Sequence, residues 1–338
     1  MSLAMIKSLQ GYETSSRAAL TVLQPKQLRV LIPYDGSDGA DTALRDLERA
    51  GLPQRFEALI AVTEVWLPSS PYEITRAVAA RRLKLLTSGM SSFAPARRDC
   101  EEQRVLSREA DRRIRSMFPS AHVTTEILEE STSIASDIVR VAKSYGVELI
   151  VVGSQGSPSP HIKDYAATAL RMARSADCSV RIARPSERSA GAPAQIMIGA
   201  DLGKSMERVV KVVSERVWPA GTKVNMVITG EPGPRDPVRE SQTVLALEGL
   251  ASTLGGRHLK VSIAVKYGQQ PEDLLLDHAK EISADCIFLE ADMLAHRQGN
   301  GDSGVLSKVA QSVVLGAPCS VEVVRPRIFT REHLDPAA

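Results

Sequence analysis

The sequence predicts an α/β protein made of two tandem copies of one unit, each a parallel sheet flanked by helices. Three observations predict this class. The length of 338 residues exceeds what one hydrophobic core usually supports and favours two domains. Short apolar, β-branched runs alternate with amphipathic helical stretches, the pattern of a parallel sheet with crossover helices. The same order of elements then occurs a second time along the chain.

The first unit is predicted to span residues 28–185, after an N-terminal extension at 1–27. Its strands are expected at 28–33, 58–65, 122–128, 149–152 and 179–183. Its helices are expected at about 37–50, 99–117, 134–145 and 164–175. The run at 149–152 is apolar on both faces, as a central parallel strand must be. The Arg-rich stretch at 68–98 is expected to hold a short helix and a loop, as a solvated face or a surface for an acidic partner.

A linker rich in Ser, Gly and Ala is predicted at 186–193, and the repeat then starts again in a second unit at 194–327, followed by a tail at 328–338. Strands are expected at 195–201, 223–228, 259–265 and 285–289, with an amphipathic helix at 271–282. The clearest internal match sets Ala176-Asp177-Cys178-Ser179-Val180 against Ala317-Pro318-Cys319-Ser320-Val321. A repeat of this size outweighs the assignment of any single element.

Composition excludes several classes of function. A formal net charge of +2 gives no overall nucleic-acid or membrane signal, and 4% aromatic residues argue against base-stacking platforms. No apolar run approaches the ~20 residues of a membrane span, and a reducing cytoplasm is the expected location. The four cysteines form no CxxC pair, which argues against a metal or dithiol site. Three histidines, His161, His278 and His296, lack metal spacing and are expected at the surface.

Two loops at carboxyl strand ends are the candidate site, because open α/β sheets bind ligands there. One is Pro33-Tyr34-Asp35-Gly36-Ser37, after the first strand, and the other is Gly153-Ser154-Gln155-Gly156, after the central strand. Glycines let backbone N–H groups approach a phosphate, and a helix N-terminus adds a favourable dipole. The purely structural alternative is that Asp35 and Ser37 only cap the first helix.

With these motifs the chain resembles the universal stress protein family, and its tandem arrangement resembles the two-domain members. The resemblance rests on the Pro33–Ser37 opening, the run from Val147 to Gly156, and the two closing Cys-Ser-Val segments, and it covers about 28–185 and 194–326. It implies Rossmann-like domains of the adenine nucleotide alpha hydrolase-like type, packed as a pseudo-dimer. The unit commonly pairs through its last strand in this family, an edge that the second repeat can satisfy here.

The resemblance also implies an ATP or adenine-nucleotide site in the first domain, with accompanying Mg²⁺ left open. Its residues would be Pro33, Tyr34, Asp35, Ser37, Val62, Val152, Gly153, Gln155, Gly156, Ala166, Ala167 and Thr168. In that set Asp35 would contact ribose or adenine, and Val62 would line the adenine pocket. The chain departs from the family where Ala166-Ala167 replaces a Gly-hydroxyl pair and Thr168 offers a hydroxyl one position late. A lost hydroxyl bond to phosphate is worth roughly 1.5–3 kcal/mol, so binding should be about ten- to a hundredfold weaker.

The second unit departs further. Glu290 and Met293 stand where Gly153 and Gly156 stand in the first unit, and a carboxylate repels phosphate. Ser307-Lys308 replaces the Gly-hydroxyl pair, and 299–304 is either a flexible loop or an anion nest. No ATP site is expected there.

The function expected from these features is a stress-response regulatory or binding protein with an unknown protein partner, as a monomer or a homodimer. A scaffold that has lost nucleotide is the first alternative. A slow ATPase or nucleotidyl transferase is the second, and it lacks a base and metal constellation beyond Asp35. The chain is therefore not expected to be an enzyme.

Overall fold

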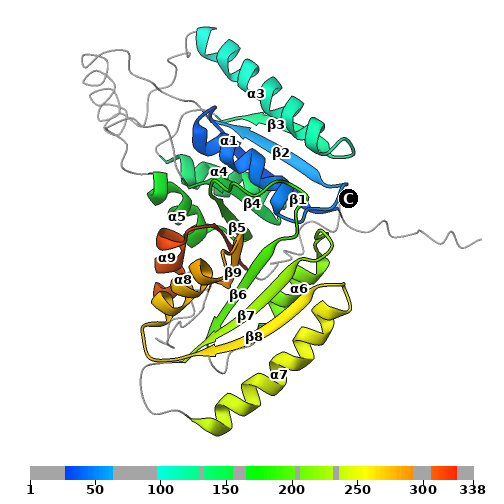
Figure 1. Cartoon of the computed structure of the whole chain (residues 1–338). Coiled ribbons are helices and arrows are strands. Elements are labelled where there is room, and N and C mark those ends of the chain that lie inside the picture. Colours follow the sequence, from blue (N-terminus) through cyan, green and yellow to red (C-terminus); the bar gives the residue numbers. More distant parts are fainter. Residues whose placement is uncertain are drawn as a thin grey trace, which may run out of the picture.

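The computed structural model describes residues 27–63, 97–128, 133–154, 165–201, 206–230, 236–291 and 306–325 (Figure 1). The elements of the first half are β1 (Arg29–Tyr34), α1 (Asp38–Asp46), a 3-10 turn (Leu47–Arg49), β2 (Glu57–Val62), α3 (Arg97–Met117), β3 (His122–Ile127), α4 (Ile134–Ser144), β4 (Leu149–Gly153), α5 (Tyr165–Ser175) and β5 (Ser179–Ala183). Those of the second half are β6 (Gln195–Asp201), α6 (Glu207–Glu215), β7 (Lys223–Thr229), α7 (Pro237–Gly255), β8 (Lys260–Lys266), α8 (Pro271–Glu281), β9 (Cys286–Glu290), α9 (Lys308–Gly316) and β10 (Ser320–Val324).

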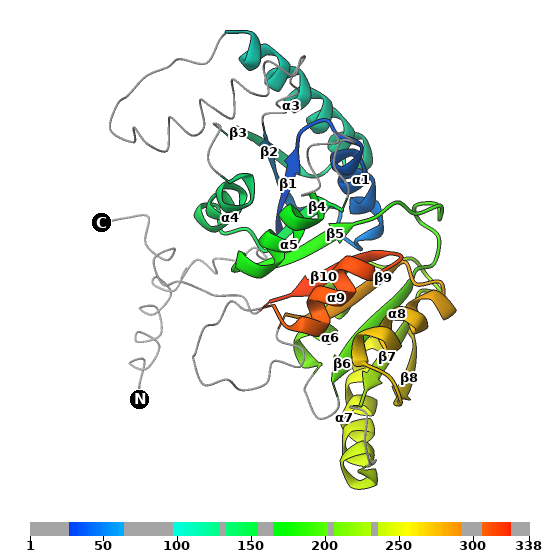
Figure 2. The ribbon, with the colours of Figure 1, turned by 90° about the vertical axis from the view of Figure 1, so that its left-hand side faces the viewer.

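All the described strands lie in one sheet of ten, in the order β3-β2-β1-β4-β5-β10-β9-β6-β7-β8. Neighbouring strands are parallel within each half, and β5 pairs with β10 antiparallel at the centre. Figure 2 shows β5 and β10 side by side, with the two halves on either side of them. The predicted fold class, two parallel-sheet units packed as a pseudo-dimer, is confirmed. Because the central pair is antiparallel, the carboxyl strand ends of the two halves point in opposite directions.

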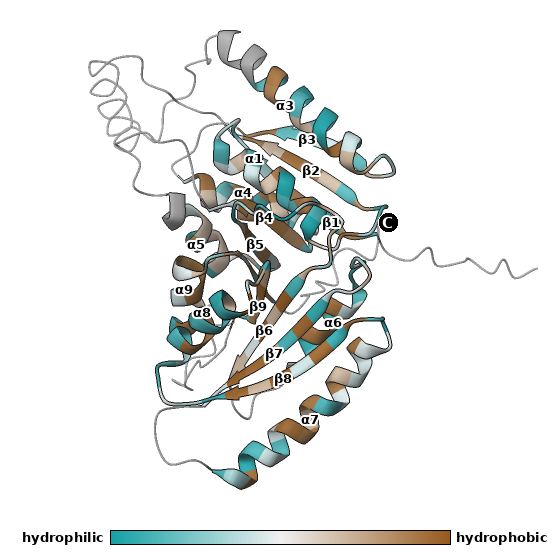
Figure 3. Cartoon of the chain, in the orientation of Figure 1, coloured by the Kyte–Doolittle hydropathy of each residue, from teal (hydrophilic) through white to brown (hydrophobic). Residues whose placement is uncertain are grey.

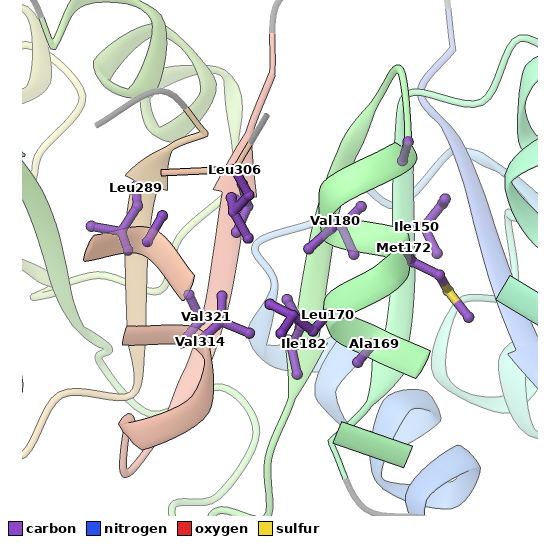
Figure 4. Packing of buried hydrophobic residues seen from close by; sticks show 14 of the residues in the cluster. Ile150, Ala169, Leu170, Met172, Val180, Ile182, Leu289, Leu306, Val314 and Val321 are labelled. Carbon is purple, nitrogen blue, oxygen red and sulfur yellow. The ribbon is translucent and has the colours of Figure 1, made fainter. Parts of the chain in front are cut away.

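Helices cover both faces of this sheet. On one face, α1 and α3 pack over the first half and α6 and α7 over the second, as two separate cores. On the other face, α4, α5, α8 and α9 enclose a single core that contains residues from both halves. Figure 4 shows Leu170 and Ile182 of the first half facing Val314 and Val321 of the second. The seam between the halves is therefore a continuous hydrophobic core and not a loose domain contact.

A buried cluster of four charges crosses the seam on the face of the sheet that α1, α3, α6 and α7 cover. The Arg181 guanidinium donates to Asp46 at 2.5 and 3.2 Å and to Glu322 Oε2 at 3.4 Å. Arg216 donates to Glu322 Oε1 at 2.6 Å, and the Ser320 hydroxyl donates to Asp46 at 3.0 Å. All four charged side chains are at most 6% exposed. The two positive and two negative charges balance, which is what allows them to lie in a protein interior.

Three details differ from the sequence-based expectations. Helices α6, α7 and α9 were given no residue range from the sequence. In α7 the residues show no apolar stripe, because Thr243 is buried while Leu245 is 71% exposed. Figure 3 shows hydrophobic and hydrophilic residues mixed along this helix. Ile134, which helical periodicity places on one face of α4 with Ile138 and Val141, is 44% exposed, and Ala135 is buried instead. His278, expected at the surface, is 8% exposed because it follows Leu274 and Leu275 on the inner face of α8. His161, His296 and almost all of the basic stretch at 68–98 lie outside the described residues.

Candidate functional site

The order of strands reverses between β1 and β4, because β1 leads outward to β2 and β4 leads to β5. Such a switch point opens a crevice at the carboxyl ends of the two strands. Leu31 is paired with Ile150, so Asp35 and Ser154, each four residues further on, leave the sheet at the same level. The two loops selected from the sequence therefore meet at this switch point.

The turn after β1 is built around Asp35, whose carboxylate accepts a hydrogen bond from the Ser37 backbone N–H at 2.9 Å. The Ser37 hydroxyl oxygen in turn accepts one from the Ala40 N–H at 3.2 Å and caps α1. Gly36 between them has a φ of +75°, which a side chain would strain. The capping roles of Asp35 and Ser37 are thus present. Asp35 stays partly exposed, and a carboxylate can accept more than the one hydrogen bond from Ser37, so it keeps acceptor capacity at the end of β1.

Gly153, at the end of β4, is needed for helix packing. A Cβ built there would lie 2.8 Å from the Cα of Gly39 in α1 and closer still to the Gly39 carbonyl. The Ser154 N–H donates to the Ala183 carbonyl at 2.9 Å and so is not available to an anion. The sequence-based reason for this glycine, room for a phosphate, is therefore incomplete. The close approach of α1 to β4 already requires glycine.

Three other predicted site residues face away from solvent. Pro33 and Val62 are buried, and Val62 packs in the core under α1 and α3. The Tyr34 hydroxyl donates to Asp41 at 2.9 Å, and Arg113 binds the same carboxylate oxygen at 2.5 Å. Burial and the hydrogen bond to Asp41 raise the pKa of Tyr34 to about 12. Any contact of these side chains with a ligand would need the sheet core to rearrange.

The remaining predicted residues belong to the edge of β4 and to α5. Val152 is partly buried against the shared core. Ala166 and Ala167 lie in the first turn of α5, where backbone N–H groups lack intrahelical partners, and Thr168 follows them, partly exposed. Gln155 and Gly156 lie outside the described residues. The first turn of α5 therefore offers described N–H donors for an anion.

The second half repeats the switch point between β6 and β9, but its contents differ. Glu290, at the position of Gly153, forms an ion pair with Arg208 of α6 at 3.1 Å. The Ser307 hydroxyl oxygen accepts a hydrogen bond from the Ala310 N–H at 3.1 Å, so it caps α9 and is buried. Met293 and the 299–304 loop lie outside the described residues. The carboxylate of Glu290, paired with the guanidinium of Arg208, thus lies where the first half has Gly153.

Histidine, cysteine and acidic side chains also occur elsewhere in the described part of the chain. Among those residues, no three His, Cys, Asp or Glu side chains gather as metal ligands would. The described helices also include none that combines the length and apolar character of a membrane span. Cys286, whose Sγ lies 3.0 Å from Arg181, is buried, and burial raises the pKa of its thiol. It therefore stays protonated beside the charge cluster.

Fold and site together define a tandem α/β protein with two switch points, one with a glycine at the end of its central strand and one with an ion pair there. The family model described as the universal stress protein family matches residues 28–184. The first half therefore belongs to the universal stress protein family, as the resemblance in its sequence indicated, and the second half repeats its fold. No curated protein matches the chain.

Solved structures agree on the fold. A universal stress protein from Archaeoglobus fulgidus DSM 4304 covers 88% of this chain and 96% of its own, with a TM-score of 0.53 and 14% identity. A protein of the same family from Pseudomonas aeruginosa UCBPP-PA14 covers 88% of this chain and 93% of its own, with a TM-score of 0.52 and 14% identity. Likeness at this identity shows the tandem fold alone. A shorter Archaeoglobus fulgidus universal stress protein, in complex with dAMP, covers 39% of this chain and 98% of its own at 21% identity, with a TM-score of 0.31.

Proposed function

We propose that this chain is a regulatory binding protein whose first half takes an adenine nucleotide, ATP above all, while its second half does not. The observation that carries the proposal is the difference between the two switch points. In the first, Asp35 directly follows β1 and accepts a hydrogen bond from the Ser37 N–H, and the first turn of α5 provides N–H groups in the same half. In the second, the carboxylate of Glu290 takes the position of Gly153 and pairs with Arg208. A ribose or adenine group can therefore donate to Asp35 while the phosphate binds N–H groups of α5, whereas a phosphate at the second switch point would meet the Glu290 carboxylate.

Turnover is not part of the proposal. A nucleotide-hydrolysing site needs a base placed on the attacking water, with further groups that stabilise the transferred phosphoryl. Asp35 is the carboxylate that directly follows β1, and it already accepts a hydrogen bond from the Ser37 N–H. The nucleotide would act by occupancy, changing how the chain meets a protein partner.

A scaffold without nucleotide is the second candidate, and two observations favour it. Gly153 is explained by its contact with Gly39, without any ligand. Ala166 and Ala167 replace the small and hydroxyl residues of ATP-binding relatives. Both proposals share one fold, so only a binding measurement separates them.

The test is a calorimetric titration with ATP of the wild type, Asp35→Asn and Gly156→Leu, preceded by the absorbance at 260 nm of the purified protein. Asp35→Asn keeps an oxygen for the Ser37 N–H and removes the charge, so the turn should survive. Loss of a hydrogen bond to a charged group should lower the affinity for ATP about tenfold or more. Asp201→Asn, the equivalent change at the end of β6, is the matched control and should not alter binding. Equal affinity in all four proteins, or no binding by the wild type, would refute the nucleotide site and leave the scaffold.

A further inference from the structure

An arginine of each half contacts the last helix of the other half across the seam. Arg184 directly follows β5 and Arg325 directly follows β10, so they occupy the same position in the two repeats. The Arg325 guanidinium donates to the Ala173 carbonyl at 2.6 Å and to the Arg174 carbonyl at 3.1 Å, in the last turn of α5. Arg184 does the equivalent for α9, donating to the Val314 carbonyl in its last turn and, at 3.0 Å, to the carbonyl of Cys319, three residues beyond the helix. Each half thus binds the carboxyl end of the other half's last helix.

This contact is strong for physical reasons. The last four carbonyls of a helix have no intrahelical donor and carry the negative end of the helix dipole. A guanidinium meets both needs, since its N–H groups reach the carbonyls and its charge opposes the dipole. Arg325 is only 7% exposed, so water and salt screen this interaction little. Its own backbone N–H is held at 3.2 Å by the hydroxyl of Ser179 in the first half.

Helix α5 links this contact to the candidate site. Its carboxyl end is held by Arg325, and its first turn, at Tyr165, lies at the carboxyl end of the first half's strands, next to the switch point. Eleven residues make a rod about 16 Å long, short enough to move as one body. Leu170 also packs against the second half (Figure 4), so α5 rests on both halves of the chain.

We propose that Arg325 of the second half is a positioning residue for the anion site of the first half, which it controls through α5. The second half, whose own switch point carries the Glu290–Arg208 ion pair, thereby sets the affinity of the first. The inference rests on the proposed nucleotide site and adds to it the regulation of that site across the seam. Removal of Arg325 leaves carbonyls of α5 without their donor and lets the helix shift along its axis or fray.

The repeat supplies its own control. Arg325→Gln and Arg184→Gln remove equivalent guanidinium contacts with the last turns of α5 and α9, and only α5 belongs to the half with the proposed site. Measured by calorimetry in the full chain, ATP should bind Arg325→Gln about three- to thirtyfold more weakly than wild type and Arg184→Gln with unchanged affinity. Arg325→Lys, which keeps the charge, should restore part of the affinity. Hydrogen exchange without nucleotide should accelerate in α5 for Arg325→Gln and in α9 for Arg184→Gln.

The outcomes separate this inference from the proposed function. Equal affinity of wild type and Arg325→Gln, or an equal loss in both glutamine variants, overturns the positioning role while the nucleotide site stands. If the wild type binds no ATP, the proposed function fails, and hydrogen exchange then decides the role of Arg325 in holding α5. Faster exchange in α5 for Arg325→Gln but not for Arg184→Gln supports that role, and unchanged exchange in α5 refutes it. The melting temperatures of the two glutamine variants are expected to fall by similar amounts, and their comparison controls for a general loss of stability.

Discussion

Replacement of Arg181 by methionine tests whether the four-charge cluster is needed for the seam to form. The guanidinium is fully buried and contacts Asp46 at 2.5 Å and Glu322 at 3.4 Å. Arg181→Met leaves two buried carboxylates with one guanidinium, that of Arg216, in a medium that solvates charge poorly. Removal of one partner of a buried pair costs about 3–5 kcal/mol. With an m-value near 3 kcal/mol/M, the urea midpoint should fall by about 1–2 M.

The assay is equilibrium unfolding in urea, followed both by far-UV circular dichroism and by tryptophan fluorescence, which includes Trp218 of the second half. Arg115→Met removes an exposed pair with Asp111, which water screens, and should lower the urea midpoint much less than Arg181→Met does. In the double variant Arg181→Met, Asp46→Leu, most of the stability should return, because only the balanced pair of Arg216 and Glu322 then remains buried. A cost in Arg181→Met no larger than that in Arg115→Met would refute the reasoning.

Three further predictions concern other parts of the chain. Gly153→Ala should destabilise the chain by about 1–3 kcal/mol or more in the same assay, because α1 cannot retreat from β4. Gly249→Ala, with open space around its Cβ, should be neutral or stabilising by up to about 1 kcal/mol. The pKa of Tyr34, raised to about 12, lies above the unfolded value near 10, so stability present below pH 10 should fall as the pH rises toward 12. Tyr34→Phe should flatten that fall in a series of melts, and a wild-type slope in the variant would contradict the assignment. Because β5 and β10 already pair with each other, sedimentation equilibrium should give the mass of a monomer, and a dimer would indicate another interface.

The repeat made the fold predictable from the sequence. Each strand candidate was a short apolar run, and its recurrence in the second half placed the elements in order before any contact was known. Periodicity failed where burial did not follow it. In α7 the exposed side of the helix carries Val238 and Leu245, so apolar residues surround the axis and no stripe is visible. On α8, His278 lies on the inner face and forms a contact with Glu281 at 3.0 Å, which spacing alone does not reveal.

The candidate site was predictable in its location but not in its contacts. A motif places Asp35 and Gly153 at carboxyl strand ends, and the pairing of β1 with β4 brings them together. The sequence could not show that Gly39 occupies the space beside Gly153, because that contact joins residues more than a hundred positions apart. The hydrogen bonds of Arg325 with the carboxyl end of α5 could not be predicted for the same reason. One signal was present, since a charge in the middle of an apolar strand at Arg181 needs a buried partner.

The two repeats differ at two places that matter for the whole chain: the seam between β5 and β10, and the switch points. Arg181 and Glu322 occupy equivalent positions and face each other directly in the antiparallel register of β5 and β10. Identical halves would place like charges there, whereas the diverged pair places opposite ones, so divergence at the seam favours the pairing of unlike halves. Divergence of Gly153 and Glu290 instead makes the two switch points unlike, because one keeps a glycine and the other carries an ion pair. Since Arg325 joins the seam to α5, the second half is placed to influence the proposed site of the first.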